Sequence, residues 1–191
     1  MILSREFFLQ PVQIVAREML GKRLIHLVRN QRVGGIIVEA EAYDGEQDLA
    51  CHARVGKTER NKVMYLQGGH AYVYFTYGMH WMLNCVTGDI GYPSAVLIRA
   101  IVPTNGIDFI KSQRPGIIEK LWCNGPAKLT KSLAITGELN GSDLCDPKGI
   151  LFIEDGMAIP DSLVKITPRV GIQSTPEPWL SKPWRFIANV S

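Results

Sequence analysis

Short blocks of apolar residues, separated by polar or glycine-containing segments, make up most of this chain. Eight blocks have the length of strands and are rich in β-branched or aromatic residues, which predicts strands. They cover residues 23–28, 35–43, 71–77, 79–87, 95–102, 150–154, 163–170 and 184–188. Other segments show helical spacing or start signals such as proline, which predicts helices. These cover Pro11–Gly21, 106–112 and 126–136.

The order of these elements predicts the fold class. Hairpin-like connections outnumber strand–helix–strand crossovers, so the sequence predicts an α+β protein with a mainly antiparallel, curved sheet and flanking helices. Gly78 interrupts two aromatic strands, which predicts a protruding β-hairpin with Tyr77 and Gly78 near its tip. Because the 191 residues contain no linker or repeat, we expect residues 1–191 to form a single compact domain.

The segment VEAEAY places Glu39, Glu41 and Tyr43 at every second position of a predicted strand. Their side chains should share one face, because a strand has a period of two. Carboxylates beside a buried strand are costly unless they are paired, and Arg99, inside another apolar strand, is an available partner. Residue types alone leave two interpretations open, a structural ion pair or an acid–base site.

Aromatic and polar residues gather around the predicted hairpin. Tyr72 and Tyr74 share one strand face, where either a packing role or a ring-binding surface fits them. Asn84 lies inside the following apolar strand, and His52 is either incidental or a donor to a bound ring. The polar loop over residues 44–62 is either solvated or contacts phosphates. Its basic residues include Arg54, Lys57, Arg60 and Lys62.

Composition narrows the functional classes. The chain is 46% hydrophobic and 20% charged, as in a typical globular protein, and its net charge of +3 permits an anionic partner. The four cysteines lack the close spacing of a zinc or redox motif. Glycine-rich phosphate loops, nucleophile elbows and zinc-deaminase signatures are missing too. Without an apolar run of membrane-spanning length or an export signal, we expect a cytoplasmic protein with reduced thiols.

Five segments occur in a distinctive order: VEAEAY, a charged loop with His52, YVYFTYGM, LNC and LIRA. This ordered set resembles the alkyladenine (3-methyladenine) DNA glycosylase family of monofunctional enzymes. The resemblance extends from GKRLIH at 21–26 to KPWRF at 182–186, nearly the whole chain. It implies a base-excision repair enzyme that flips an alkylated or deaminated purine out of duplex DNA. Such an enzyme hydrolyses the N-glycosidic bond with a glutamate-activated water and leaves an abasic site.

The resemblance also implies roles for individual residues. Glu41 matches the catalytic glutamate, while Arg99 and the carbonyl of Val170 match groups that hold the attacking water. Tyr77 matches the wedge that fills the gap left by the flipped base. The base-pocket positions of the family fall on Tyr43, His52, Tyr74 and Asn84. Its remaining DNA-contacting positions fall on Met79, Thr58, Met64 and Lys128.

The implied reaction needs no cofactor, metal ion or lysine nucleophile. We expect a monomer that binds double-stranded DNA containing damaged purines and does not bind membranes. We expect it in the cytoplasm, at the nucleoid of a bacterium, or in the nucleus of a eukaryote. Two other classes remain open, a non-catalytic nucleic-acid-binding domain of the same fold and a hydrolase of free nucleosides. The complete set of Glu41, Arg99 and aromatic residues favours an enzyme, and the projecting Tyr77 favours duplex DNA over nucleosides.

Overall fold

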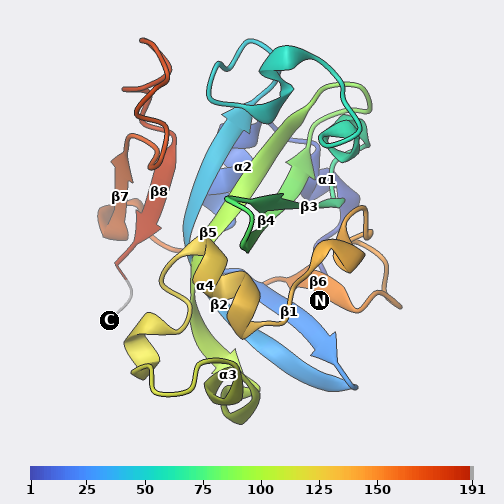
Figure 1. Cartoon of the computed structure of the whole chain (residues 1–191), viewed down its shortest axis with the longest axis vertical. Coiled ribbons are helices and arrows are strands. Elements are labelled where there is room, and N and C mark those ends of the chain that lie inside the picture. The colour runs from blue at the N-terminus through green and yellow to red at the C-terminus, as the bar shows by residue number, and fades with distance from the viewer. Residues whose placement is uncertain (190–191) are drawn as a thin grey trace.

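The β-branched and aromatic blocks form one eight-stranded antiparallel sheet in the computed structural model, which describes residues 1–189 (Figure 1). Its strands are β1 (Arg23–Val28), β2 (Gln31–Asp44), β3 (Ala71–Thr76), β4 (His80–Thr87), β5 (Ser94–Asn105), β6 (Leu151–Glu154), β7 (Val164–Thr167) and β8 (Arg185–Ala188). The α-helices are α1 (Arg5–Phe8), α2 (Val12–Glu18), α3 (Ile107–Gln113) and α4 (Pro126–Ser132). Short 3-10 helices lie at His52–Val55, Lys62–Tyr65, Glu119–Leu121, Gly137–Leu139 and Asp161–Leu163. The predicted single-domain α+β architecture is confirmed.

Strand β2 lies at the centre of the sheet, and its neighbours change along its length. Strand β5 pairs with it from Gly34 to Asp44, whereas its other edge pairs first with β1 and then, from Glu39 to Glu41, with β8. The sheet thus runs β3-β4-β5-β2-β1-β6, with β8 and β7 as a branch. The register against β5 shifts on both sides of Glu39, an irregularity of the kind that bends a strand. Both glutamates of VEAEAY therefore lie at the branch point.

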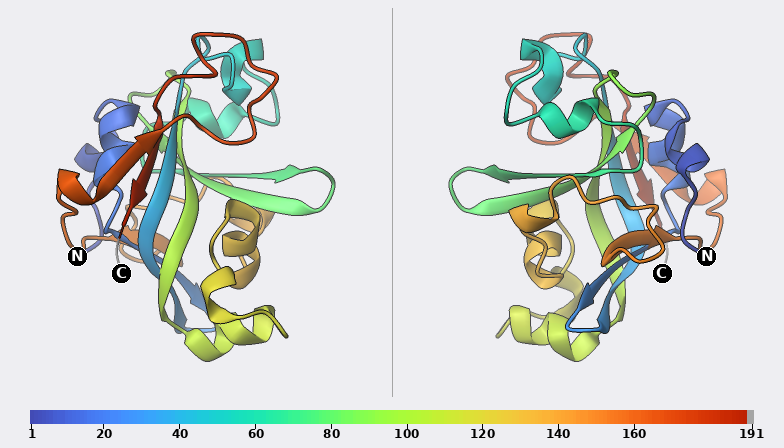
Figure 2. Two further views of the ribbon diagram at one scale, coloured as in Figure 1. Left: turned by 90° about the vertical axis from the view of Figure 1, so that its left-hand side faces the viewer. Right: turned by 90° about the vertical axis from the view of Figure 1, so that its right-hand side faces the viewer.

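Short helices cover the two faces of the sheet (Figure 2). Helix α2 packs against β2, β5 and β8, while α4 packs against β4 and β5 on the other side. The main core lies between these layers and includes Phe8, Met19, Leu24, Ile37 and Ile98. A smaller cluster beside the hairpin includes Cys51, Met64, Tyr72, Val86 and Ala95. Within residues 1–189, no helix is both long and apolar enough to cross a membrane.

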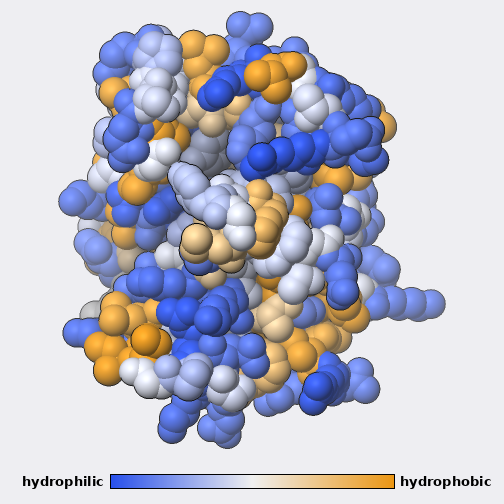
Figure 3. Space-filling view, in the orientation of Figure 1, coloured by the Kyte–Doolittle hydropathy of each residue, from blue (hydrophilic) through white to orange (hydrophobic). Residues whose placement is uncertain are grey.

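Strands β3 and β4 form the predicted hairpin, which projects away from the body of the molecule (Figure 2). The last residue pair is Thr76 with His80, so the turn consists of residues 77–79. Tyr77 and Gly78 have φ angles of 52° and 66°. Glycine adopts this left-handed conformation readily, whereas a tyrosine rarely does. The face of the molecule around the hairpin is largely hydrophilic, with smaller hydrophobic groups among the polar side chains (Figure 3).

Two of the three predicted helices are longer than the observed ones, whereas the helix predicted over 106–112 matches α3 to within one residue at each end. The helix predicted over Pro11–Gly21 corresponds to α2, which ends at Glu18, so the glycine does not cap it directly. The helix predicted over 126–136 corresponds to α4, which ends at Ser132. Ala134 has a left-handed φ of 53°, and this conformation cannot continue a right-handed helix.

Strand ends also differ from the predictions. The strand predicted over 163–170 is limited to β7, Val164–Thr167, because Pro168 has no amide hydrogen for the ladder. The hairpin strands stop one residue earlier and start one residue later than the predicted 71–77 and 79–87. The polar loop that shows no period contains a short 3-10 helix, His52–Val55. Cys51 caps the N-terminus of this helix, and its sulfur accepts a hydrogen bond from the Ala53 amide at 3.5 Å.

Candidate active site

Glu41 is fully buried, and three hydrogen-bond donors surround its carboxylate. The Val170 backbone amide donates to Oε1 at 2.8 Å. The Tyr43 hydroxyl and Nη1 of Arg99 donate to Oε2 at 2.9 and 3.3 Å. Because all three groups are donors, the arrangement fits an ionised carboxylate, which only accepts. Burial raises the pKa of Glu41, and Arg99, Val170 and Tyr43 oppose that rise. The group is therefore a carboxylate with an increased tendency to take up a proton.

Glu39, on the same strand face, holds two arginines. Its Oε1 accepts hydrogen bonds from Nε of Arg99 and Nε of Arg185, both at 2.7 Å. The pairing of strands explains this contact, because Glu39 lies opposite Ala100 of β5 and Ile187 of β8. The predicted pairing of Arg99 with a glutamate is therefore confirmed for both glutamates. Arg99 bridges the two carboxylates and fixes their relative position.

A cavity of about 300 Å³ lies beside this charged group and the hairpin. Its walls combine aromatic and apolar side chains with a few polar ones, as is usual for a small-molecule site. The residues predicted to contact a bound base all line it: Tyr43, His52, Tyr74 and Asn84. Arg99 and Val170 line it as well, whereas Glu41 does not. Glu41 lies behind three of the lining residues, each of which donates to its carboxylate.

Contacts between side chains orient the aromatic walls of this cavity. Nδ1 of His52 lies 3.0 Å from the Tyr72 hydroxyl, and the His52 ring packs edge-on against Tyr74 with centroids 4.4 Å apart. Burial, with Arg60 and Arg54 nearby, lowers the pKa of His52 to about 4, so the imidazole is uncharged at neutral pH. Asn84 donates to the Tyr72 carbonyl at 3.0 Å. The cavity therefore presents neutral aromatic rings in a fixed arrangement.

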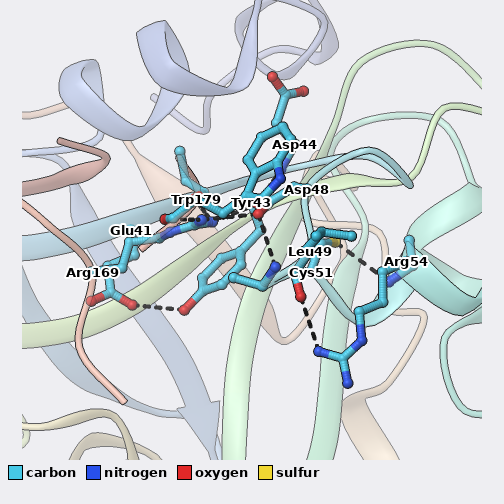
Figure 4. A network of polar contacts seen from close by, with 12 residues as sticks. Glu41, Tyr43, Asp44, Asp48, Leu49, Cys51, Arg54, Arg169 and Trp179 are labelled. Atoms are coloured by element: carbon cyan, nitrogen blue, oxygen red, sulfur yellow. Dashed lines mark hydrogen bonds and ion pairs between the residues drawn. The ribbon is translucent and has the colours of Figure 1, made fainter. Parts of the chain in front are cut away.

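A buried ion pair joins the loop after β2 to the segment that carries Val170 (Figure 4). Arg169 donates to both Asp48 oxygens, at 2.5 and 2.9 Å, and both side chains are fully buried. Arg169 also donates to the Ala42 carbonyl at 3.0 Å, and its Cζ lies 4.7 Å from the centroid of the Tyr43 ring. It thus contacts the two residues that follow Glu41 and directly precedes Val170. The Asp48–Arg169 pair therefore fixes Tyr43 and Val170, two of the donors to Glu41, relative to each other.

The tip of the hairpin is exposed although it carries large side chains. Tyr77 is 81% exposed and Met79 is 66% exposed, and Tyr77 also lines the mouth of the cavity. An exposed tyrosine in a left-handed conformation contributes little to folding, and strained residues of this kind concentrate at functional sites. The predicted projection of Tyr77 is confirmed.

The other residues predicted to contact DNA occupy different places. Met64 is buried and lines the aromatic cavity. Thr58 lines a second, polar cavity of about 460 Å³, which shares His52 with the first. Lys128 lies on α4, with Nζ 2.9 Å from the side-chain oxygen of Asn124. The structure therefore brings Met64 and Tyr77 to the aromatic cavity and leaves Met79, Thr58 and Lys128 outside it.

Sequence reasoning missed the Asp48–Arg169 pair. The two residues lie 121 positions apart, and each is a single charged residue in a segment without a distinctive pattern. It also missed the Val170 amide as a donor to Glu41, because the resemblance assigned a role only to the carbonyl. The only available signal was the position of Arg169 directly before Val170 in PRVG.

Comparisons with known proteins agree with this geometry. The model of the family described as Methylpurine-DNA glycosylase (MPG) matches residues 6–191. A protein of Carboxydothermus hydrogenoformans is 47% identical over 97% of this chain and 94% of its own length. Relatives from Methanocella arvoryzae and Myxococcus xanthus are 46% and 41% identical, over 97% and 96% of this chain and 91% and 88% of their own. All three bear the name "Putative 3-methyladenine DNA glycosylase". The resemblance is confirmed, and this chain belongs to the methylpurine-DNA glycosylase family.

Proposed function

We propose that this chain removes alkylated purines from duplex DNA as a monofunctional 3-methyladenine DNA glycosylase and that Glu41 activates the attacking water. The observation that carries the proposal is a carboxylate held by three donors behind the wall of an aromatic cavity. Membership of the methylpurine-DNA glycosylase family and the names of the relatives support alkylated purines as substrates. Base excision is the function that needs both features together.

The damaged base lies between Tyr43 on one side and His52 with Tyr74 on the other. Stacking on aromatic rings is worth roughly 1–3 kcal/mol per base and tolerates different bases. A purine alkylated on a ring nitrogen carries positive charge, which favours stacking on tyrosine. Asn84 lines the same cavity and restricts which purines fit.

Hydrolysis then proceeds without a covalent enzyme intermediate. Ionised Glu41 accepts a proton from water as the water oxygen bonds to C1′ of the sugar. The C1′–N bond breaks, and its electron pair leaves with the base. The carboxylate also stabilises positive charge that develops on the sugar, while Arg99 and the Val170 carbonyl hold the water. Oε1 of Glu41 accepts one hydrogen bond, from the Val170 amide, so it can still accept one from the water. Because Glu41 is fully buried and does not line the cavity, a lining residue must shift to admit the water.

Groups around the cavity bind the DNA. Tyr77 enters the duplex and replaces the stacking of the flipped base, and Met79, Thr58 and Lys128 contact the strand near it. Met64 contacts the flipped nucleotide inside the cavity, because it lines that cavity. We propose that residues 1–191 act as one domain and as a monomer. Because its substrate is DNA, the protein works in the bacterial cytoplasm at the nucleoid, or in the nucleus of a eukaryote.

The test compares Glu41→Gln with the unaltered protein on duplexes that each carry one defined lesion. The variant should bind the lesion and fail to release the base, because stacking survives and water activation does not. Glu154→Gln is a matched control, since Glu154 pairs with Arg32 at the other end of the sheet. Normal excision by Glu41→Gln would overturn the assignment. Lesion binding without excision by the unaltered protein would indicate a binding domain, and cleavage of free nucleosides would indicate a nucleoside hydrolase.

A further inference from the structure

Two tyrosine rings that line the aromatic cavity, the proposed site of the damaged base, each have an arginine guanidinium close to them. Cζ of Arg169 lies 4.7 Å from the Tyr43 centroid, and Cζ of Arg60 lies 5.6 Å from the Tyr74 centroid. Both tyrosines line the cavity, but neither arginine does. Arg60 instead lines the neighbouring polar cavity. Each guanidinium therefore approaches its ring from outside the space that a base would occupy.

The two arginines differ in how their charge is balanced. Arg169 is fully buried and is neutralised by the two oxygens of Asp48. Arg60 is exposed, and within residues 1–189 it forms no ion pair with a carboxylate. Its Nη2 donates to the Phe75 carbonyl at 3.2 Å, which ties the guanidinium to the strand that carries Tyr74. Arg60 therefore places an uncompensated positive charge behind one wall of the base cavity.

We propose that Arg60 is a specificity-determining residue, which weakens the preference of the cavity for positively charged bases relative to neutral ones. The inference rests on the proposed function, because it assumes that the cavity holds the damaged base. It applies to two chemical classes of lesion. Purines alkylated on a ring nitrogen, such as 7-methylguanine, carry a positive charge, whereas deaminated purines such as hypoxanthine are neutral.

The physical reason is that Arg60 and a bound base would both interact with the π-electrons of the Tyr74 ring. A cation over an aromatic face draws π-density toward itself. The face toward the cavity then becomes less negative and attracts a second cation less strongly. Direct repulsion between the guanidinium and a charged base acts in the same direction. A neutral base is not repelled by the guanidinium in this way, and its stacking depends less on the negative charge of the ring face. The effect of Arg60 therefore depends on the charge of the base.

The test is the ratio of the single-turnover excision rate of 7-methylguanine to that of hypoxanthine, in the same duplex sequence, with enzyme in excess over DNA but below saturation of binding. Arg60→Gln should raise this ratio about two- to fivefold, the change expected from an exposed cation–π contact. General loss of DNA affinity cancels in the ratio, because both duplexes carry the same phosphates. Arg60→Lys keeps the charge, and its ratio should lie closer to that of the unaltered protein.

Lys62→Gln provides the matched control. Lys62 is another exposed cation of the same loop, but it pairs with Glu59 at 2.7 Å. Its replacement should leave the ratio unchanged. An unchanged or lowered ratio in Arg60→Gln, or an equal rise in Lys62→Gln, would overturn the inference while excision itself still supports the proposed function. If the unaltered protein released 3-methyladenine but neither of these two lesions, this inference would be wrong and the proposed function would stand. Release of none of the three bases would overturn both.

Discussion

At the scale of single residues, Glu41 combines burial with three donors, and these have opposite effects on its charge. Burial disfavours the carboxylate, whereas Arg99, Val170 and Tyr43 favour it. Burial has the larger effect, so the pKa of Glu41 is raised from its usual 4.5. A raised pKa suits a group that must take a proton from water during the reaction.

The pH dependence of excision follows from this shift. Excision of a neutral lesion should fall as the pH decreases through the raised pKa of Glu41, above the range of an ordinary glutamate. His52 does not account for this limb, because its pKa is lowered to about 4. Loss of folding caused by Glu41 does not explain this limb either. A carboxyl group whose pKa is raised in the folded state stabilises the fold at low pH, and this stability is lost only as the pH rises through the raised pKa. Single-turnover rates with circular dichroism at each pH test this, and an acid limb below pH 4.5 would contradict it.

Local spacing determined which site residues could be predicted. Glu39, Glu41 and Tyr43 repeat with the period of a strand, and an arginine inside an apolar strand needs a carboxylate. These facts indicated a charged cluster and left its purpose open. Only the family resemblance separated Glu41, the proposed catalytic residue, from Glu39. Contacts such as Asp48 with Arg169 depend on how distant segments meet, and no local pattern encodes them.

At the scale of elements, the hairpin of β3 and β4 presents Tyr77 away from the core (Figure 2). Its existence was predictable because aromatic, β-branched strands flank a glycine. Its exact ends were not, since the left-handed conformations at Tyr77 and Gly78 shorten both strands. A left-handed conformation at Ala134 likewise ends α4 early, at Ser132. Backbone conformations of this kind are set by tertiary context more than by residue type.

Tyr77→Ala should impair base flipping and leave stability almost unchanged. The ring is 81% exposed, so its removal leaves no buried cavity, in contrast to a core aromatic, whose truncation costs roughly 3–5 kcal/mol. Without the wedge, the stacking lost on flipping, on the order of a few kcal/mol, is no longer replaced. Flipping of a fluorescent etheno base and the melting temperature measure the two effects. The loss should be larger for a stably paired lesion than for an unpaired one, and early melting with normal flipping would show that Tyr77 is structural.

At the scale of the whole molecule, the chain carries a net charge of only +3, so binding to DNA depends on where the positive residues lie. Arg54, Lys57, Arg60 and Lys62 belong to the loop beside the aromatic cavity. Lys128 lies on α4, which flanks the side toward which the hairpin projects (Figure 2). Strand β7 lies on the opposite side. We therefore propose that the face from which the hairpin projects contacts the phosphates.

This arrangement predicts a salt dependence and a difference between two charge reversals. Lesion binding should weaken steeply with salt, because each neutralised phosphate releases counterions. Lys128→Glu should weaken binding to damaged and undamaged duplexes alike, since phosphate contacts carry no sequence information. Lys165→Glu, on exposed β7, changes the net charge equally and should have a much smaller effect. Fluorescence anisotropy across a salt series measures all three, and the two reversals should also differ in slope, because only Lys128→Glu removes a phosphate contact. Equal losses would mean that net charge alone drives binding, and affinity indifferent to salt would count against a DNA substrate.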